Sequence, residues 1–277
     1  FNSDPNVFSI GEDIATYGGQ LRCSYDLIED FGGDRIMDTP ISENAIVGTA
    51  IGSSIVGLRP VVELSYVDFI GVCFDQIMNQ AAKLRYMYGG RVSLPLVIRT
   101  QGGAGLGNGA QHSQSLEAIL AHIPGIRVVM PSNAYDAKGL LLHAIRDNNP
   151  VVFIEHKALY KKKCEVPEEP YECDYCCDIK KEGTDITFVA YSSMVDQSLK
   201  AAAELEKEGI SAEVVDIRSL EPFDADTVIK SVEKTGRAVV AHEANVKGGF
   251  GAEIASTIQE RAFDSLKAPV QRVGAPN

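Results

Sequence analysis

The chain has 277 residues, of which 45% are hydrophobic and 23% charged, a composition typical of a soluble protein with one large or two ordinary domains. Its formal net charge of -12 argues against nucleic-acid and anionic-membrane surfaces, because both require basic patches. No apolar stretch approaches the roughly 18 residues that span a bilayer, and the N-terminus has no signal-peptide pattern, so we expect a cytoplasmic protein without nucleic-acid or membrane partners.

Strand-like apolar runs alternate with helical periods throughout the first half of the chain. The runs lie at 6–10, 35–41, 59–64, 94–99, 126–130 and 151–155, and helical periods at 43–57, 69–88 and 133–146. Continuous Val and Ile runs joined by amphipathic helices predict parallel strands that are buried on both faces. We therefore expect a doubly wound α/β domain over residues 1–160.

The second half repeats this α/β plan. Strand-like runs lie at 185–191, 210–217, 237–244 and 268–273, and helical periods at 193–209, 223–236 and 249–266. The first two of these helices end on Gly209 and Gly236, where a left-handed terminal residue is favoured. A second doubly wound domain is expected over 185–277, with a linker over 161–184, where charge, proline and lost periodicity coincide.

Six cysteines in a chain of this length do not form a disulfide framework. Cys173, Cys176 and Cys177 lie close together in CDYCC, which contains one CxxC spacing. A tetrahedral zinc site needs further ligands, and no second CxxC or well-placed histidine supplies them. We therefore expect free cysteines in a linker or an edge strand.

A glycine-rich loop, 101–115, follows one strand and precedes a helix, as a dinucleotide-binding loop does. The GxGxxG pattern is matched poorly, because its third position is Asn108 when counted from Gly103 and Ala110, a permitted but weaker fit, when counted from Gly105, and no acid ends the next strand. A dinucleotide site is therefore the less favoured interpretation. The loop carries His112, which either acts as acid, base or hydrogen-bond donor or is an ordinary surface histidine. GxSxG, Walker A and HExxH patterns are absent from the sequence.

The loop 145–152 contains Asp147 and Asn149 between a helix and a strand. Such residues usually cap helices and form turns. Their oxygens, together with backbone carbonyls, are also ligands that a hard cation prefers. Spacing alone favours the turn and leaves the cation site as the alternative.

Glu43 stands at the start of a predicted helix of small and apolar residues. A carboxylate in the first turn complements the helix dipole, which contributes about 0.3 to 1 kcal/mol. This explains an acid, but not an acid on a helix suited to close packing. Because a buried, unpaired carboxylate is costly, Glu43 should have a partner, and none lies nearby in the sequence.

Long motifs in this chain resemble those of one enzyme family. In the first half they are DTPISE, VDFIGVCFDQIMNQAAKLRYMYGG, AQHSQS, HIPG, PSNAYDAKGLL and AIRDNNPVV, and in the second EKEGISAEVVDIRSLEP and GGFGAEI. Their order is similar to that in the beta subunit of the thiamine-diphosphate-dependent decarboxylating component of 2-oxo acid dehydrogenase complexes. The resemblance implies a transketolase-like pyrimidine-binding domain, a transketolase C-terminal domain and an α2β2 heterotetramer with an alpha subunit.

The resemblance also implies roles for individual residues. Glu43 would bind a ring nitrogen of the cofactor's aminopyrimidine and favour the tautomer that removes the thiazolium proton. Ile41 and Phe69 would pack around that ring. His112 would assist acyl transfer to lipoamide on the acyltransferase core, and Asp13 would belong to a proton path between active sites.

The same resemblance implies two metal ions. In several relatives a structural potassium ion is held by the loop that corresponds here to Leu96, Ala144, Ile145, Asp147 and Asn149. The Mg²⁺ and diphosphate are held in this superfamily by a GDG motif, which these 277 residues lack. The alpha subunit is therefore expected to hold them, and this chain to be inactive alone.

The substrate implied is pyruvate, acetoin or another small 2-oxo acid. Two alternatives stay open at this point. One is a non-catalytic interaction subunit with the same fold, and the other is a self-contained transketolase-like enzyme. Mg²⁺-dependent cofactor binding by the isolated chain would favour the second alternative.

Overall fold

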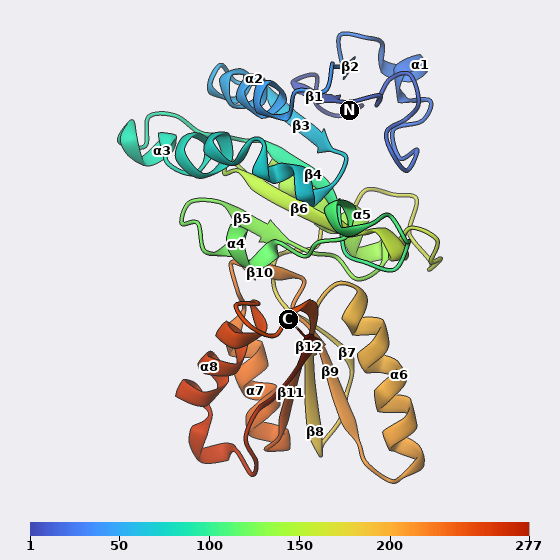
Figure 1. Ribbon diagram of the computed structural model, residues 1–277, viewed down its shortest axis with the longest axis vertical. Coiled ribbons are helices and arrows are strands. Elements are labelled where there is room, and N and C mark those ends of the chain that lie inside the picture. The colour runs from blue at the N-terminus through green and yellow to red at the C-terminus, as the bar shows by residue number, and fades with distance from the viewer. Residues whose placement is uncertain (277) are drawn as a thin grey trace.

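The computed structural model describes residues 1–276, which form two α/β units stacked along the long axis of the molecule (Figure 1). The first unit contains a seven-stranded sheet of order β10-β5-β6-β4-β3-β1-β2. Its strands are β1 (Val7–Gly11), β2 (Ile36–Asp38), β3 (Arg59–Leu64), β4 (Val97–Gly102), β5 (Arg127–Val129), β6 (Val151–His156) and β10 (Ser219–Glu221). All pairs are parallel except β10 with β5, so a strand from the second half of the chain completes the first sheet at its edge.

Helices cover both faces of this sheet because alternate strand residues are buried on opposite sides. One face packs in one core with α2 (Glu43–Ile55), through Val62 and Ile98 among others. The other face packs with α5 (Ala134–Arg146), through Val61 and Val97. The remaining helices of this unit, α1 (Leu27–Phe31), α3 (Leu84–Met87) and α4 (Glu117–Ala121), are short.

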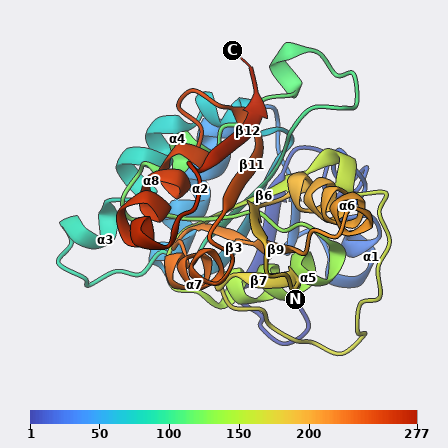
Figure 2. The same cartoon turned by 90° about the horizontal axis from the view of Figure 1, so that it is seen from below.

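The second unit is built in the same way around a five-stranded sheet of order β12-β11-β8-β9-β7. Its strands are β7 (Asp178–Lys181), β8 (Ile186–Ala190), β9 (Ala212–Asp216), β11 (Ala238–Asn245) and β12 (Gln271–Ala275). Helix α6 (Ser193–Lys207) covers one face, and α7 (Ala225–Thr235) and α8 (Gly251–Arg261) cover the other (Figure 2). The predicted pair of doubly wound α/β folds is confirmed.

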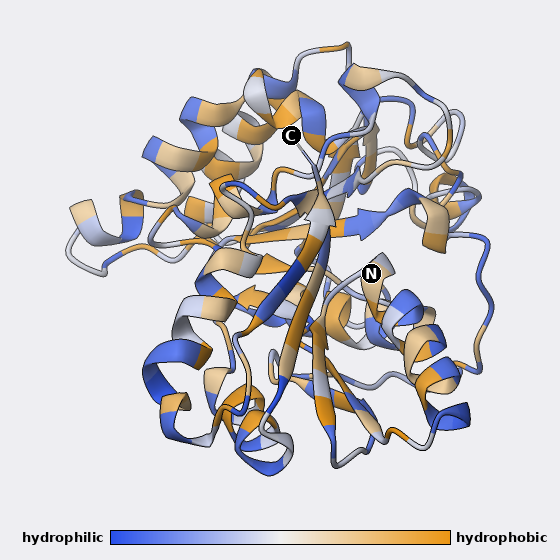
Figure 3. Ribbon diagram, turned by 60° about the horizontal axis from the view of Figure 1, so that its bottom comes forward, coloured by the Kyte–Doolittle hydropathy of each residue, from blue (hydrophilic) through white to orange (hydrophobic). Residues whose placement is uncertain are grey.

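Hydrophobic residues concentrate in the strands of both sheets and alternate with hydrophilic residues around the helices (Figure 3). This is the pattern expected for sheets buried between helical layers. Among the helices of residues 1–276, none is long and apolar enough to cross a membrane.

The structure differs from the sequence-based prediction in two segments. Residues 69–88 do not form one helix but a 3₁₀ turn, η1 (Val67–Gly71), a π-helical turn, η2 (Gln76–Ala81), and α3. The buried residues Val67, Ile70 and Cys73 recur every third position, which matches the 3₁₀ period rather than the α period. In the expected linker, β7 pairs antiparallel with β9 as the edge strand of the second sheet.

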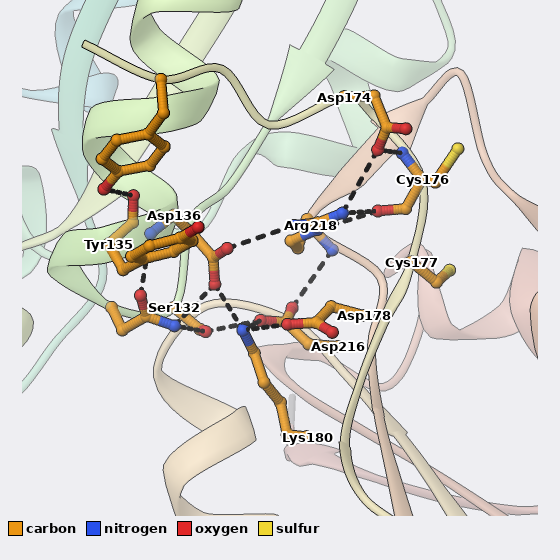
Figure 4. Close-up of polar contacts among 12 residues, drawn as sticks. Ser132, Tyr135, Asp136, Asp174, Cys176, Cys177, Asp178, Lys180, Asp216 and Arg218 are labelled. Carbon is orange, nitrogen blue, oxygen red and sulfur yellow. Dashed lines mark hydrogen bonds and ion pairs between the residues drawn. The ribbon is translucent and has the colours of Figure 1, made fainter. Parts of the chain in front are cut away.

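A buried polar network joins the two units (Figure 4). Asp136 of α5 accepts hydrogen bonds from Lys180 Nζ (2.5 Å) and Arg218 Nη1 (3.2 Å), which both belong to the second half of the chain. Ser132 Oγ donates to Asp216 Oδ2 at 2.5 Å. Burial raises the pKa of Asp216 to about 7, although Ser132 and Lys180 oppose this rise. The network ties the edge of one sheet to the other sheet.

Candidate functional site

The candidate site lies where the parallel strands β1, β3 and β4 end. In a parallel sheet the carboxyl ends of neighbouring strands lie at one edge, which is the usual location of ligand sites in open α/β folds. From this edge the chain continues into the loop 11–20, into η1 and into the glycine-rich loop 103–114. Residues from all three segments and from the start of α2 meet there, as the following contacts show.

Glu43 is the first residue of α2 and only 6% exposed. The charge of Glu43 affects the pKa of two neighbouring groups. Burial raises the pKa of Glu12, and Glu43 raises it further, while burial followed by Glu43 raises the pKa of the Cys73 thiol to about 12. Glu12 Oε1 is itself buried without a hydrogen-bond partner among the described residues. The start of α2 therefore brings together two carboxylates and a thiol.

No lysine, arginine or histidine within residues 1–276 forms an ion pair with Glu43. The helix N-terminus stabilises a carboxylate there, but a buried acid with acidic neighbours also favours a bound group that donates a proton or carries a basic nitrogen. An aminopyrimidine ring has both features. The residues around Glu43 thus fit the pyrimidine end of thiamine diphosphate.

Three rings, from η1, the residue before it and the glycine-rich loop, pack together at this edge of the sheet and form an aromatic wall. The His112 ring meets Tyr66 and Phe69 edge-on, with centroid distances of 4.7 and 5.4 Å, and Tyr66 and Phe69 are 5.8 Å apart. Phe69 precedes Cys73 by one helical turn, and Cys73 Sγ contacts its carbonyl oxygen at 3.9 Å. The Glu43 side of the site is therefore continuous with the His112 loop.

Two further residues of the site, Tyr66 and Glu12, are not predicted by any motif in the sequence. Tyr66 is 6% exposed, and its hydroxyl accepts hydrogen bonds from Gln20 (3.1 Å) and Asn108 (3.2 Å), so it joins two of the site's loops. Glu12 precedes the predicted site residue Asp13 in the motif GED. Its position one residue from a predicted acid was the only sequence signal for it.

The other two predicted cofactor residues lie at the surface of the site. Ile41 is 82% exposed in the loop before α2. Asp13 is exposed and has a left-handed backbone (φ 56°), and its carbonyl oxygen accepts from Tyr17 N and Gly19 N, both at 3.0 Å. An apolar side chain and an acid are thus presented outward next to Glu43, where a ligand or another chain can contact them.

The expected potassium loop lies at the opposite edge of the sheet, after α5. Its Asp147 side chain pairs with Arg127 and accepts from Asn149 N (3.0 Å) and Asn149 Nδ2 (2.8 Å). Tyr175 OH donates to the second carboxylate oxygen at 3.3 Å. The oxygens of Asp147 are therefore satisfied by protein donors.

Four of the five expected ligand residues also accept hydrogen bonds at their backbone carbonyls. Arg59 Nη1 donates to the carbonyl oxygens of Ile145 (2.9 Å) and Asp147 (3.1 Å), and Nη2 donates to Asn148 Oδ1 at 2.8 Å. Backbone N–H groups donate to Leu96 O (3.0 Å) and Ala144 O (3.3 Å). A potassium ion here would have to share the carbonyl oxygens of Ile145 and Asp147 with the Arg59 guanidinium, which already brings a positive charge to the loop.

The cysteine cluster contains no disulfide, and all six cysteines are free. Arg218 Nε binds the carbonyl oxygen of Cys176, at 2.8 Å, rather than its sulfur, which anchors the CDYCC segment through its backbone. Across residues 1–276, no group of three or more histidine, cysteine, aspartate or glutamate side chains has the arrangement of a metal site.

Comparison with protein families agrees with the two-unit fold. Residues 1–163 match the family described as the transketolase pyrimidine binding domain, and residues 176–277 match the transketolase C-terminal domain. A solved structure described as a split-gene transketolase, an inactive beta4 tetramer, has a TM-score of 0.79 and 26% identity to this chain. The alignment covers 100% of this chain and 84% of that one.

Curated relatives are more similar in sequence. The beta subunit of acetoin:2,6-dichlorophenolindophenol oxidoreductase from Cupriavidus necator is 49% identical, over 99% of this chain and 84% of the relative. The beta subunit of the pyruvate dehydrogenase E1 component from Bacillus subtilis is also 49% identical, over 99% of this chain and 85% of the relative. Both similarities extend over the two units.

Proposed function

The chain belongs to the transketolase-like beta subunits of the pyruvate and acetoin dehydrogenases, and from this premise we propose that it supplies the pyrimidine-binding half of a thiamine-diphosphate site. The observation that carries the proposal is the Glu43 carboxylate, buried at the carboxyl edge of the sheet with acidic groups and no cation beside it. When bound, the cofactor supplies an electron sink for cleavage of the bond next to a carbonyl carbon.

Glu43 holds a proton at a ring nitrogen of the aminopyrimidine in this proposal. A carboxylate in a water-poor site interacts strongly with such a proton, because the local dielectric constant is low. Phe69 and Ile41 provide apolar contacts to the ring. Asp13 and its neighbour Glu12 provide acids close to Glu43, through which a proton can reach or leave the site.

His112 acts in the transfer of the acyl group to a lipoyl group in this proposal. In that step the sulfur–sulfur bond breaks, one sulfur bonds to the acyl carbon, and the other leaves as a thiolate that takes up a proton. The two electrons come from the decarboxylated or cleaved substrate. A histidine can supply the proton near neutral pH, and the aromatic wall fixes its ring.

An alpha subunit completes the site in the proposed α2β2 heterotetramer. It holds the diphosphate and Mg²⁺, since this sequence has no GDG motif. The substrate is pyruvate or acetoin, and the acceptor is the lipoyl group of an acyltransferase core. We place the protein in the cytoplasm because its six cysteines are all free, as expected in a reducing compartment.

The proposed complex has no potassium ion in the loop of Leu96, Ala144, Ile145, Asp147 and Asn149. Instead, the Arg59 guanidinium serves as the cation of this loop. Its hydrogen bonds to Ile145 O, Asp147 O and Asn148 Oδ1 support this assignment.

Glu43→Gln in the reconstituted heterotetramer tests the role of the carboxylate. We expect 2-oxo acid or acetoin turnover to fall by about 10²–10⁴-fold, the usual contribution of a positioned acid or base, while assembly with the alpha subunit persists. Glu253→Gln, which removes an exposed first-turn carboxylate from α8, is the matched control. Turnover of Glu43→Gln within a factor of two of the wild type would contradict the proposal.

Cofactor titration of the isolated chain separates the alternatives. Calorimetry with thiamine diphosphate and Mg²⁺ should detect tight binding only after the alpha subunit is added. Tight Mg²⁺-dependent binding by the chain alone would indicate a self-contained transketolase-like enzyme. A wild-type heterotetramer that binds the cofactor but turns over no substrate would indicate an interaction subunit.

A further inference from the structure

The loop that carries His112 depends on contacts made outside the loop. It leaves β4 at Gly102 and is closed at its base by a hydrogen bond from Gly103 N to Gln114 O (3.0 Å). The ten residues 103–112 include four glycines with positive φ, which leaves the backbone little intrinsic preference for one conformation. The position of His112 must therefore be fixed by neighbouring elements.

Glu243, on β11 of the second unit, contacts the base of this loop. Its Oε1 accepts a hydrogen bond from Ala104 N at 2.6 Å, across 139 positions of sequence. Its Oε2 binds His156 Nε2 at 2.6 Å and accepts from Ser193 Oγ at 2.9 Å. One carboxylate thus joins the loop to the ends of strands in both sheets.

The negative charge of Glu243 and the tautomer of His156 strengthen the hydrogen bond between these two residues. Burial opposes ionisation of Glu243, but the hydrogen bonds from His156, Ala104 and Ser193 outweigh it and lower the pKa of Glu243 to about 2. His156 Nδ1 accepts from Ala158 N at 3.1 Å, so His156 Nε2 carries the proton that it donates to Glu243. Charge-assisted hydrogen bonds of this kind are stronger than neutral ones.

The backbone at the base of the loop packs closely against His156. Gly103 has φ +86°, and a Cβ atom there would collide with the His156 ring. The far end of the loop is held separately, because the buried Lys157 Nζ donates to the carbonyl oxygen of His112 and lies 5.1 Å from the centroid of the Tyr66 ring. The loop is therefore anchored at both ends, and Glu243 is the anchor that comes from the second unit.

We propose that Glu243 is a positioning residue, which fixes the base of loop 103–112 from the second domain so that His112 faces the site. The inference rests on the proposed function for its catalytic consequence, but not for the anchor itself. It gives the C-terminal domain a part in acyl transfer through the position of His112. Loss of the Glu243 side chain should impair the step that uses His112 more than the steps that use Glu43.

Hydrogen–deuterium exchange tests the anchor without any assay of activity. In the full chain, alone and with the alpha subunit, Glu243→Ala should accelerate exchange in peptides covering 103–114 by about tenfold or more relative to wild type. Glu243→Gln should exchange more slowly than Glu243→Ala, because its amide oxygen still accepts from Ala104 N. Glu233→Ala, at an exposed carboxylate of α7, should not change exchange in this segment. Unchanged exchange in Glu243→Ala would contradict the proposal that Glu243 anchors the base of this loop.

Kinetic measurements test the expected effect of the Glu243 anchor on acyl transfer. In the heterotetramer, Glu243→Ala should slow acylation of a lipoyl domain at least about tenfold, as expected for a misplaced catalytic group. Reduction of the dye 2,6-dichlorophenolindophenol, which needs no lipoyl group, should stay within about twofold of wild type. An equal fall in both rates would overturn the positioning role. A wild type that reduces neither acceptor would instead contradict the proposed function, while the exchange result would still decide the anchor.

Discussion

Two carboxylates and a thiol lie close together at the N-terminus of α2. Glu43, Glu12 and Cys73 come from three segments, and the charge of Glu43 adds to burial in raising the pKa of both Glu12 and Cys73. A site of this kind is costly for the folded chain alone, because acids without a cation lose solvation without gaining an ion pair. Such a cost is typical of residues retained for binding or catalysis.

The Cys73 thiol should be inert. Cys73 is fully buried, and burial together with the charge of Glu43 raises its pKa to about 12, so very little reactive thiolate exists at pH 8. We expect iodoacetamide to alkylate Cys73 at least about 100-fold more slowly than the exposed Cys164 in the native chain, measured by peptide mass spectrometry. Equal rates in the native chain would refute the burial of Cys73, and equal rates after unfolding in urea are the control.

At the scale of single elements, a side chain at the start of β3 binds the turn after α5. The turn after α5 ends with carbonyl oxygens that face the start of β3, and Arg59 reaches them from there. A guanidinium presents several donors in a fixed plane, so one side chain can satisfy several oxygens at once. Local spacing in the loop does not reveal this donor, which lies 86 positions away from Ile145.

Arg59→Met should therefore destabilise the chain without any change in the loop sequence. Loss of the donor leaves two backbone carbonyls to find other partners, at a cost of about 1–3 kcal/mol in the free energy of unfolding. Urea unfolding followed by circular dichroism measures this cost, with the exposed Arg91→Met as control. In the wild type, exchange of K⁺ for Na⁺ at constant ionic strength should leave the midpoint unchanged. A midpoint that rises specifically with K⁺ would argue for an ion in the loop.

At the scale of the whole molecule, the second half of the chain contributes a strand and side-chain contacts to the first unit. The strand β10 follows β9 in the chain but pairs with β5 in the first sheet. The chain between them, at Arg218, donates to Asp136 of α5, and the neighbouring Asp216 accepts from Ser132. Together with the Glu243 anchor, these contacts make the relative placement of the units part of the site's construction.

This interface should weaken as pH rises. The pKa of Asp216 is about 7 in the folded chain and near its usual value of 3.8 in the unfolded chain, so the folded state binds the extra proton between these values. Stability from protonated Asp216 is present below pH 4 and is lost as pH rises through about 7. Lys180, Asp136 and Arg218 also face this group and modulate the effect.

Asp216→Asn should remove most of this dependence. The neutral amide imitates the protonated acid, so its stability relative to wild type should increase by a few kcal/mol between pH 5 and pH 8.5. Thermal unfolding across that range measures the difference, with Asp264→Asn, at an exposed aspartate, as control. Parallel pH curves for wild type and Asp216→Asn would show that Asp216 is ionised throughout.

Much of the fold could be predicted from local pattern. Buried strands in an α/β protein leave continuous Val and Ile runs, and amphipathic helices leave a clear period, so the alternation at both ends of the chain predicted two doubly wound sheets. Residues 69–88 were harder, because a buried period that changes from three to four residues mimics a single α-helix. The edge strand β7 has too few residues and too much charge to stand out from a linker.

Contiguous residues and local periodicity encode the two α/β units, the family resemblance and the conspicuous acid Glu43, so these features could be predicted before the fold was known. The roles of Glu43, His112, Phe69, Ile41 and Asp13 remain predictions. The folded chain was needed to show that Glu12 and Tyr66 join the site, that Arg59 binds the expected cation loop and that Glu243 contacts the base of the His112 loop. These contacts connect segments up to 139 positions apart, and strand order and register, not local pattern, bring such segments together.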